Sequence, residues 1–278
     1  MNRHPSHACA PVRLDSCVAS GATDAGRVRR ENQDRFVFDP RAKVIAVADG
    51  MGGHAFGARA AALALERIAA SLTRAVDALR PSSLDATLAD DPDATVFDAS
   101  LNAARVLTNA LDDANATLYA LNRGERIDAH RSMGTTVTGI WLPPGLGVLF
   151  AFHVGDSRLY RLRDGALTQL TRDQTLFQHA LETGDVEHLP PRNVLLQALG
   201  PEPSIAPEVA AHAWRPGDRY LLCSDGLHGE VPHHEIERTL AQMSSRDLDA
   251  ACGRLIELAC EAGGKDNVTA VIVCFEGR

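Results

Sequence analysis

The stretch VIAVADGMGGHAFG, residues 44–57, decides the fold of this chain. Its first five residues are apolar and rich in β-branched side chains, which predicts a short buried strand. Asp49 and four glycines follow directly. Beyond Gly57, apolar residues return at steps of three and four to about Ala78, which predicts a helix. The sequence therefore places Asp49 at the end of a strand, where a glycine-rich turn leads into a helix.

Strands and helices continue to alternate along the rest of the chain. Asp164-Gly165, between the apolar runs Tyr160–Leu162 and Ala166–Leu170, indicates a hairpin. We therefore expect an α+β fold of antiparallel sheets with helices packed outside them. We also expect a flexible segment over residues 1–12, one domain over residues 13–278, and a solvated connection over residues 81–95. The expected strands are Val44–Ala48, Thr135–Leu142, Val148–Val154, Tyr220–Cys223 and Thr269–Phe275, and the expected helices cover about Gly57–Ala78, Val96–Asn122, His233–Met243 and Arg246–Ala262.

The charge and the cysteines restrict the class of protein. The 278 residues include 28 Lys and Arg against 36 Asp and Glu, a net charge of −8, which argues against duplex nucleic acid or an anionic membrane as the main partner. No apolar run approaches the roughly 18 residues of a membrane span. The first residues lack the apolar core of a secretory signal peptide, and the six cysteines form no CxxC pair. We therefore expect a cytoplasmic protein with reduced cysteines.

Five aspartates share one position in the pattern, at a point where a strand ends or begins. An aspartate before glycine is also an ordinary turn signal, and for any single residue that is the simpler interpretation. Gathered at sheet ends, however, these carboxylates would repel one another unless a divalent cation neutralised them. Oxygen ligands without a zinc-type His/Cys set predict Mg²⁺ or Mn²⁺. The five are Asp34, Asp49, Asp156, Asp225 and Asp266.

The glycines after Asp49 allow two interpretations. They would let a backbone carbonyl approach a bound ion closely, or they would serve a tight turn between strand and helix. A phosphate-binding P-loop is excluded, because the chain contains no GxxxxGK[ST] motif. The glycines are Gly50, Gly52, Gly53 and Gly57.

Taken in order, seven motifs make the chain resemble the metal-dependent protein phosphatases (PPM, or type 2C), in their bacterial Ser/Thr branch. The resemblance covers about Gly26 to Val273, nearly the whole chain. It implies a four-layer α-β-β-α sandwich of two antiparallel sheets flanked by helices, with a binuclear metal centre at one end. The motifs are GRVRRENQD, VIAVADGMGGHAFG, SMGTTVTG, FHVGDSRLYRLRDGALTQLTRD, RNVLLQALG, GDRYLLCSDGL and GGKDNVTAVIV.

The resemblance also implies a set of metal ligands for two Mn²⁺ or Mg²⁺ ions. Asp49 resembles the carboxylate that bridges the two ions, and the Gly50 carbonyl resembles a ligand of the second ion. Asp225 and Asp266 resemble the ligands of the first ion. Asp156 matches a residue associated with a third, weaker ion in bacterial members of the family.

Three further residues match positions around those ligands. Arg29, rather than its neighbours Arg27 and Arg30, matches the arginine that grips the substrate phosphate, for which a guanidinium is suited because it binds two oxygens at once. Asp34 resembles the acidic residue that holds a metal-bound water. Asn267 resembles a residue that supports the ligands from behind.

This set implies a phosphoprotein Ser/Thr phosphatase, a phosphoric monoester hydrolase. Two metals about 3.5–4 Å apart can share a water and lower its pKa, so that it attacks phosphorus in line without a covalent intermediate. Cys223 has no arginine in reach after it, which argues against a cysteine-based tyrosine phosphatase. The expected partners are phosphorylated proteins, a bacterial Ser/Thr kinase and its targets, with no nucleic acid and no membrane, and the expected state is a monomer.

Departures from the family pattern leave some roles open. Met51 stands where the eukaryotic branch has a proposed acid histidine, so the proton donor is unassigned, with a metal-bound water as the default. His54 and His153 are interpreted as structural. The segment 171–185 matches the family's flap beside the site and carries Gln174 where bacterial members often have histidine. Two alternatives keep the same fold: a pseudophosphatase that binds without turnover, and a phosphatase that acts on an anti-sigma-factor antagonist.

Overall fold

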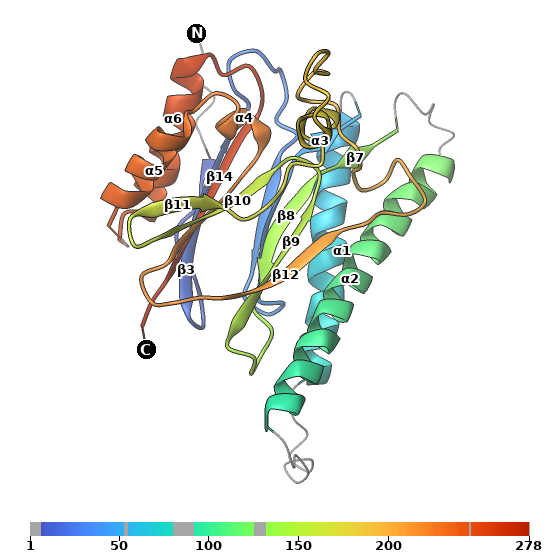
Figure 1. Ribbon diagram of the computed structural model, residues 1–278, viewed down its shortest axis with the longest axis vertical. Coiled ribbons are helices and arrows are strands. Elements are labelled where there is room, and N and C mark those ends of the chain that lie inside the picture. The colour runs from blue at the N-terminus through green and yellow to red at the C-terminus, as the bar shows by residue number, and fades with distance from the viewer. Residues whose placement is uncertain (1–6, 53–54, 80–91, 125–131, 245, 278) are drawn as a thin grey trace.

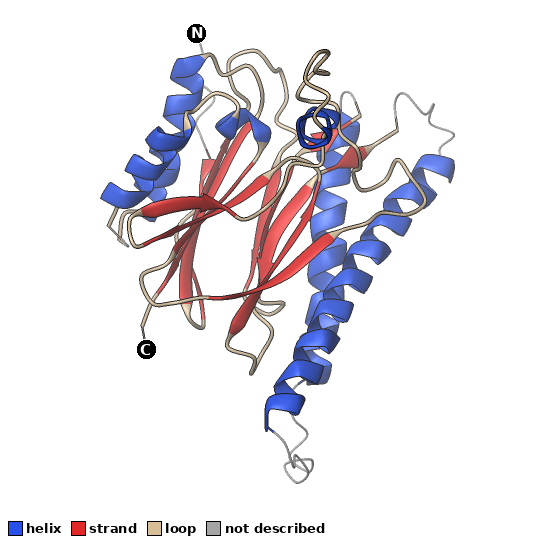
Figure 2. Ribbon diagram, viewed as in Figure 1, coloured by secondary structure: helices blue, strands red, loops and turns tan. Residues whose placement is uncertain are grey.

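The computed structural model describes residues 7–52, 55–79, 92–124, 132–244 and 246–277. Two antiparallel sheets lie face to face, with a pair of long helices outside one sheet and shorter helices outside the other (Figures 1 and 2). This arrangement confirms the expected α+β fold of two sheets flanked by helices. Among the described residues, no helix combines the length and the apolar character that a membrane span requires.

The first sheet carries the C-terminal half of the site. Its strand order is β1-β3-β14-β13-β10-β11, and β2 pairs with β3. All eight residues of the central strand β14 are buried. Asp164 and Gly165 join β10 to β11 with φ of 52° and 81°, which fits the predicted two-residue hairpin. The strands are β1 (His7–Ala8), β2 (Val12–Leu14), β3 (Cys17–Asp24), β10 (Arg158–Arg163), β11 (Ala166–Gln169), β13 (Arg219–Cys223) and β14 (Val268–Phe275).

The second sheet carries the glycine-rich stretch. Its order is β12-β9-β8-β5-β4, in which the fully buried β5 lies between β8 and β4. A separate short pair, β6 with β7, continues directly beyond β5. The strands are β4 (Arg35–Asp39), β5 (Val44–Ala48), β6 (Gly50–Met51), β7 (Gly134–Thr135), β8 (Val137–Trp141), β9 (Val148–Val154) and β12 (Glu208–Ala213).

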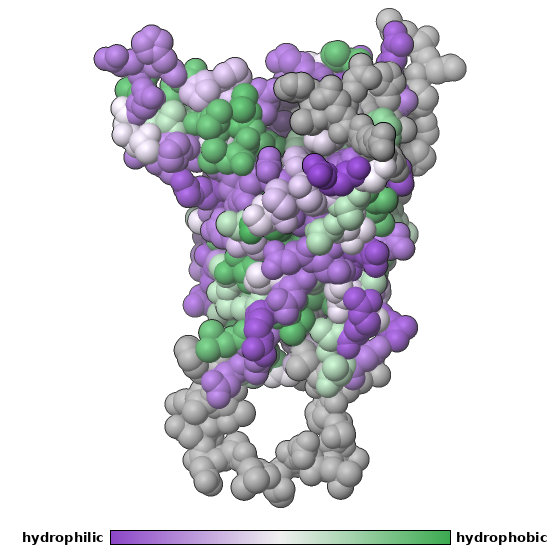
Figure 3. Space-filling model, turned by 90° about the vertical axis from the view of Figure 1, so that its right-hand side faces the viewer, coloured by the Kyte–Doolittle hydropathy of each residue, from purple (hydrophilic) through white to green (hydrophobic). Residues whose placement is uncertain are grey.

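The helices cover the outer faces of the sheets. In α1, Ala60, Ala61 and Ala64 are fully buried, and such small side chains let the helix approach the second sheet closely. Hydrophilic side chains cover much of the face that α1 and α2 present, with hydrophobic ones between them (Figure 3). The helices are α1 (Ala55–Leu79), α2 (Pro92–Gly124), α3 (Leu176–Thr183), α4 (Asp225–His228), α5 (His233–Gln242) and α6 (Leu248–Ala262).

The sequence predictions match these elements closely, with a few additions. Each expected strand and helix is present, with ends that differ by a few residues. Residues 1–6 lie outside the described ranges, whereas His7–Ala8 pairs with β3. Of the expected connection over residues 81–95, residues 81–91 lie outside the described ranges and the remainder begins α2. The sequence patterns did not predict the strands β1, β2, β3, β6 and β12 or the helices α3 and α4.

Candidate active site

One cleft of about 490 Å³ collects most of the predicted site residues at the ends of the two sheets. Four of the five aspartates line it, together with Arg29, Gly50 and Asn267. Asp34 is not among the lining residues; it is 1% exposed and lies behind them. The four lining aspartates are Asp49, Asp156, Asp225 and Asp266.

Asp49 is held through its backbone. Its N–H donates to Thr136 Oγ1 over 3.1 Å, and its carbonyl accepts from the Thr135 hydroxyl and the Thr136 N–H, each over 2.9 Å. These contacts hold the turn through the backbone of Asp49, and the residue lines the cleft. Next to it, Gly50 lies against Gly57 of α1, where a Cβ on either residue would collide with the other's backbone. The tight strand-to-helix turn thus accounts for these two glycines.

Asp225 begins the one-turn helix α4, directly after β13. A Cβ on the following residue, Gly226, would collide with the carbonyl of Asn267. This close approach brings α4 against the loop before β14, and so sets Asp225 beside Asp266 in the same cleft.

The loop that carries Arg29 is fastened to the loop that carries Asp266. Asn267 accepts from the Gln33 N–H over 2.8 Å and donates to the carbonyls of Ala25 and Glu31 over 3.1 and 2.9 Å. Arg29 Nη2 then lies 2.7 Å from Asp266 Oδ2. The predicted phosphate-binding arginine is therefore paired with a predicted metal ligand.

Only one carboxylate oxygen of Asp34, Oδ2, accepts hydrogen bonds from the described residues. Ser224 Oγ and Thr269 Oγ1 donate to its Oδ2 over 2.6 and 2.7 Å. Its Oδ1 is buried without a hydrogen-bond partner among the described residues, and so is Oδ1 of Asp225. Because a buried polar atom without a partner is costly, two bare carboxylate oxygens in one place indicate a ligand that would satisfy them.

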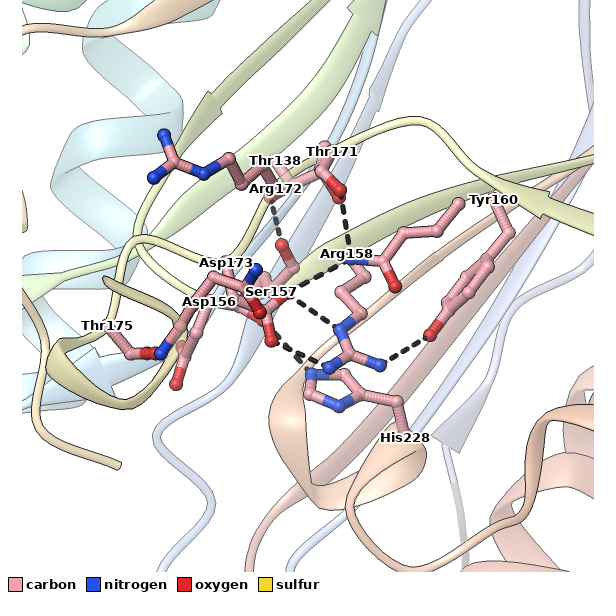
Figure 4. A network of polar contacts seen from close by, with 12 residues as sticks. Thr138, Asp156, Ser157, Arg158, Tyr160, Thr171, Arg172, Asp173, Thr175 and His228 are labelled. Atoms are coloured by element: carbon pink, nitrogen blue, oxygen red, sulfur yellow. Dashed lines mark hydrogen bonds and ion pairs between the residues drawn. The ribbon is translucent and has the colours of Figure 1, made fainter. Parts of the chain in front are cut away.

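Asp156 lies beside a polar network that the sequence patterns did not predict (Figure 4). Its carbonyl accepts from His228 Nε2 over 3.0 Å. Within the network, Arg158 donates through Nε and Nη2 to Asp173 over 2.8 and 2.6 Å, and through Nη1 to the Tyr160 hydroxyl over 2.9 Å. Arg158 and Asp173 both lie in a motif quoted for the family resemblance, but nothing in its spacing pairs them.

The same network fixes the base of the segment predicted as a flap. Gln174 Oε1 accepts from the Gly155 N–H over 2.7 Å, and the Gln174 N–H donates to the Gly155 carbonyl over 2.8 Å. Gln174 therefore holds the turn that carries Asp156. No residue of the segment 171–185 lines the cleft, whereas Asn193 and Leu195, which follow it in the chain, do.

The electrostatics of the cleft favour a cation. Burial, partly offset by the hydroxyl donors, raises the pKa of Asp34 to about 6. Burial and the charge of Asp225 raise the pKa of Asp156 to about 7. Burial also raises the pKa of Asp49 well above its usual value and raises the pKa of Asp225, with the charges of neighbouring carboxylates adding to both shifts. The carboxylates are thus short of positive charge, which a pair of divalent ions would supply.

The residues present fit a metal centre of hard cations. Every candidate ligand is an oxygen, two of those oxygens are buried and bare, and carboxylates outnumber the one paired arginine. In the described part of the chain, however, no three His, Cys, Asp or Glu side chains already form a ligand cluster. Asp266 Oδ2 is engaged with Arg29, so an ion bound there would compete with this pair.

The described histidines stand outside the lining of the cleft, although His228 contacts the backbone carbonyl of Asp156. His153 is buried against the Thr138 hydroxyl and the Arg172 carbonyl, at 2.8 and 3.1 Å, and burial lowers its pKa to about 4. It is therefore neutral at physiological pH and holds the sheet. His54 lies outside the described residues. Met51 lines the cleft, and no described histidine does.

Comparisons with known proteins agree on one family. A family model described as "Protein phosphatase 2C" matches residues 25–255. The chain is 35% identical over 257 residues to serine/threonine protein phosphatase PstP of Mycobacterium tuberculosis, across 90% of this chain but only 43% of that protein. It is 30% identical over 259 residues to serine/threonine phosphatase stp of Listeria monocytogenes, across 90% of this chain and 93% of that protein.

A solved structure is also similar over most of the chain. It is the catalytic domain of PstP in complex with two manganese ions. The TM-score is 0.73 at 32% identity, and the match covers 94% of this chain and 99% of that one.

Proposed function

The chain belongs to the protein phosphatase 2C family, and from this premise we propose that it hydrolyses phosphoserine and phosphothreonine in proteins. The observation that carries the proposal is the convergence of Asp49, Asp225 and Asp266 on one cleft beside Arg29. The pseudophosphatase alternative would require a missing carboxylate, and each of the expected carboxylates is present.

The chain's residues divide the work between ions and phosphate. Asp49, Asp225, Asp266 and the Gly50 carbonyl would hold two divalent ions. When bound, such ions supply a water of lowered pKa and offset the charge of the phosphate. Arg29, released from Asp266, would bind two phosphate oxygens and align the phosphorus for in-line attack.

Asp34 is the group that would orient the attacking water. Its bare Oδ1 can accept a hydrogen bond from the water, while its Oδ2 is already occupied by two hydroxyls. The chain uses no cysteine nucleophile for this step. Cys223 is fully buried, and burial raises the pKa of its thiol to about 12, so the thiolate is absent at neutral pH.

The finer assignments are part of the same proposal. We assign Mn²⁺ or Mg²⁺ to the two ions, Asp156 to a third, weaker ion, and Asn267 to support of the Arg29 loop. A Ser/Thr kinase and its targets are the proposed source of phosphorylated substrate, and the bacterial cytoplasm is the proposed location. The related mycobacterial and Listeria proteins, named as Ser/Thr phosphatases, support the substrate class.

A direct assay tests this function. The purified chain should hydrolyse p-nitrophenyl phosphate and phosphothreonine peptides with Mn²⁺ and lose this activity with a chelator. Asp225→Asn should remove most of the activity while the protein stays folded. If Mn²⁺ binds but both substrates stay intact, the protein is a pseudophosphatase and the proposed function is wrong.

A further inference from the structure

We propose that the buried hydroxyls of Ser224 and Thr269 are positioning groups that aim the Asp34 carboxylate at the attacking water, and that Thr23 and Asn32 set the direction of the Thr269 hydroxyl. The inference rests on the proposed function for the role of Asp34. It assigns no contact with substrate or metal to the hydroxyls themselves, which act through Asp34.

The Ser224 and Thr269 hydroxyls belong to one sheet, and they donate hydrogen bonds to Asp34 beside the other sheet. Asp34 directly precedes β4 of the second sheet, whereas Ser224 follows β13 and Thr269 lies in β14 of the first sheet. All three residues are at most 1% exposed. Both donors meet the same oxygen, Oδ2, so the carboxylate cannot rotate without breaking two buried hydrogen bonds.

The direction of each hydroxyl hydrogen follows from its neighbours. Asn32 Oδ1 accepts the Asp34 N–H over 3.1 Å, so its other amide atom is the donor that meets Thr23 Oγ1 at 2.8 Å. An ionised carboxylate has no hydrogen to give, so Thr269 must donate to Asp34. The 2.8 Å contact between the Thr23 and Thr269 hydroxyls, which face each other across β3 and β14, is then donated by Thr23.

Ser224 is directed in the same way. Its Oγ accepts the Thr269 N–H over 3.0 Å, which leaves its one hydrogen for Asp34. Two chains of hydrogen bonds therefore end on Asp34 Oδ2. One runs from Asn32 through Thr23 to the Thr269 hydroxyl, and the other runs from the Thr269 N–H to the Ser224 hydroxyl. Aligned hydrogen bonds polarise one another, which strengthens the last one in each path. The result is a carboxylate whose second oxygen, Oδ1, is left bare.

The test compares Thr269→Val with Thr269→Ser in the full chain. Loss of a hydrogen bond to a charged group should lower kcat in Thr269→Val roughly 10- to 100-fold, with KM for a phosphothreonine peptide within about twofold. Thr269→Ser keeps the hydroxyl and should restore kcat to within about threefold of the parent. Mn²⁺ affinity measured by calorimetry should change far less than kcat, because Asp34 itself stays in place.

Ser224→Ala gives a second route if Thr269→Val fails to fold. Its matched control is Ser20→Ala, since Ser20 is a fully buried serine of β3 whose hydroxyl donates to the Cys9 carbonyl. Ser224→Ala should lower kcat, and Ser20→Ala should leave kcat unchanged. Equal kcat for Thr269→Val and the parent, or equal impairment in the Ser and Val variants, would overturn the positioning role.

A readout without catalysis separates this inference from the proposed function. In the metal-free protein, the losses of Tm from Ser224→Ala and Thr269→Val should be non-additive, because both hydroxyls share one oxygen. Additive losses would overturn the shared hydrogen bonding to Asp34. If the parent protein is inactive but the Tm losses of the two variants are non-additive, the phosphatase function is refuted and the shared hydrogen bonding to Asp34 still holds.

Discussion

Arg29 Nη2 lies 2.7 Å from Asp266 Oδ2, so the proposed phosphate-binding group neutralises a proposed metal ligand. The two side chains are 55% and 34% exposed, and solvent screening makes such a pair weak. An ion that takes Asp266 would free the guanidinium for the substrate phosphate. We therefore expect metal binding and substrate binding to be linked through the Arg29 side chain.

Replacement of Arg29 by alanine should therefore weaken substrate binding without weakening the binding of Mn²⁺. We expect KM for a phosphothreonine peptide to rise roughly 10- to 100-fold, since a charge-assisted bidentate contact is lost. Mn²⁺ affinity, measured by calorimetry, should stay equal or improve by up to about fivefold, because Asp266 no longer has a competing partner. Arg30→Ala is the control, and a larger KM increase in that variant would transfer the phosphate role to Arg30.

Asp225→Asn should make the metal-free protein more stable while it destroys activity. Burial and the charge of Asp266 raise the pKa of Asp225, which means that its ionised form is unfavourable in the folded state without metal. The neutral amide removes that penalty, so Tm in a chelator should rise. Activity should fall by more than about 100-fold. Loss of a residue that only supports a metal ligand costs up to about 100-fold, and Asp225 is proposed to be a ligand itself.

The control for this variant is Asp112→Asn, which changes the net charge equally at an exposed position of α2. It should leave both Tm and activity nearly unchanged. A metal-free Asp225→Asn protein that melts below the parent would show that the carboxylate stabilises the fold, contrary to the argument from burial.

Local patterns predicted those parts of the fold that are determined locally. Val44–Ala48 is a strand with the predicted bounds, because a short β-branched run is buried on both faces. The strand β3, CVASGATD, was missed because its residues are small rather than β-branched. They are small for a tertiary reason: a Cβ on Gly21 would press against Val271 and Phe36. No window of the sequence contains that contact.

The site divides in the same way. The five aspartates were identifiable because each stands at a strand end, which is a local signal. The hydroxyl groups that bind Asp34 were not identifiable, because Ser and Thr are common and their pairing depends on the register of neighbouring strands. Thr23 meets Thr269 across 246 positions of chain, and only the alignment of β3 with β14 brings them together. The pairing of Arg29 with Asp266 likewise depends on the loop held by Asn267.

Asp156→Asn should gain stability over the parent as the pH rises. Burial raises the pKa of Asp156 to about 7, above its ordinary value of 3.8. Between these values the folded state binds more protons than the unfolded state, so the contribution of Asp156 to the free energy of unfolding falls as the pH rises through about 7. The asparagine has no such dependence.

The measurement is Tm in a chelator at several pH values from about 5 to 8. Comparison of variant with parent is needed because His153 and His228, whose pKa values burial lowers to about 4, make stability rise with pH in the acid range. The variant and the parent share this contribution of the histidines, so it cancels in the difference between their Tm values. A difference in Tm that stays constant with pH would contradict the raised pKa of Asp156.

Arg158→Met should destabilise the protein much more than Arg172→Met. Arg158 forms a two-point contact with Asp173 in which the side chains are 23% and 13% exposed. Its loss leaves a mostly buried carboxylate without its cationic partner and with only the Gln169 amide as a donor among the hydrogen bonds described, at a cost of about 2–4 kcal/mol in the free energy of unfolding. Arg172 pairs with Glu182 at the surface, where the side chains are 57% and 35% exposed and solvent screening leaves the pair little effect on stability. Denaturant unfolding measures both costs, and equal values would mean that the network beneath Asp156 contributes no more than a surface ion pair.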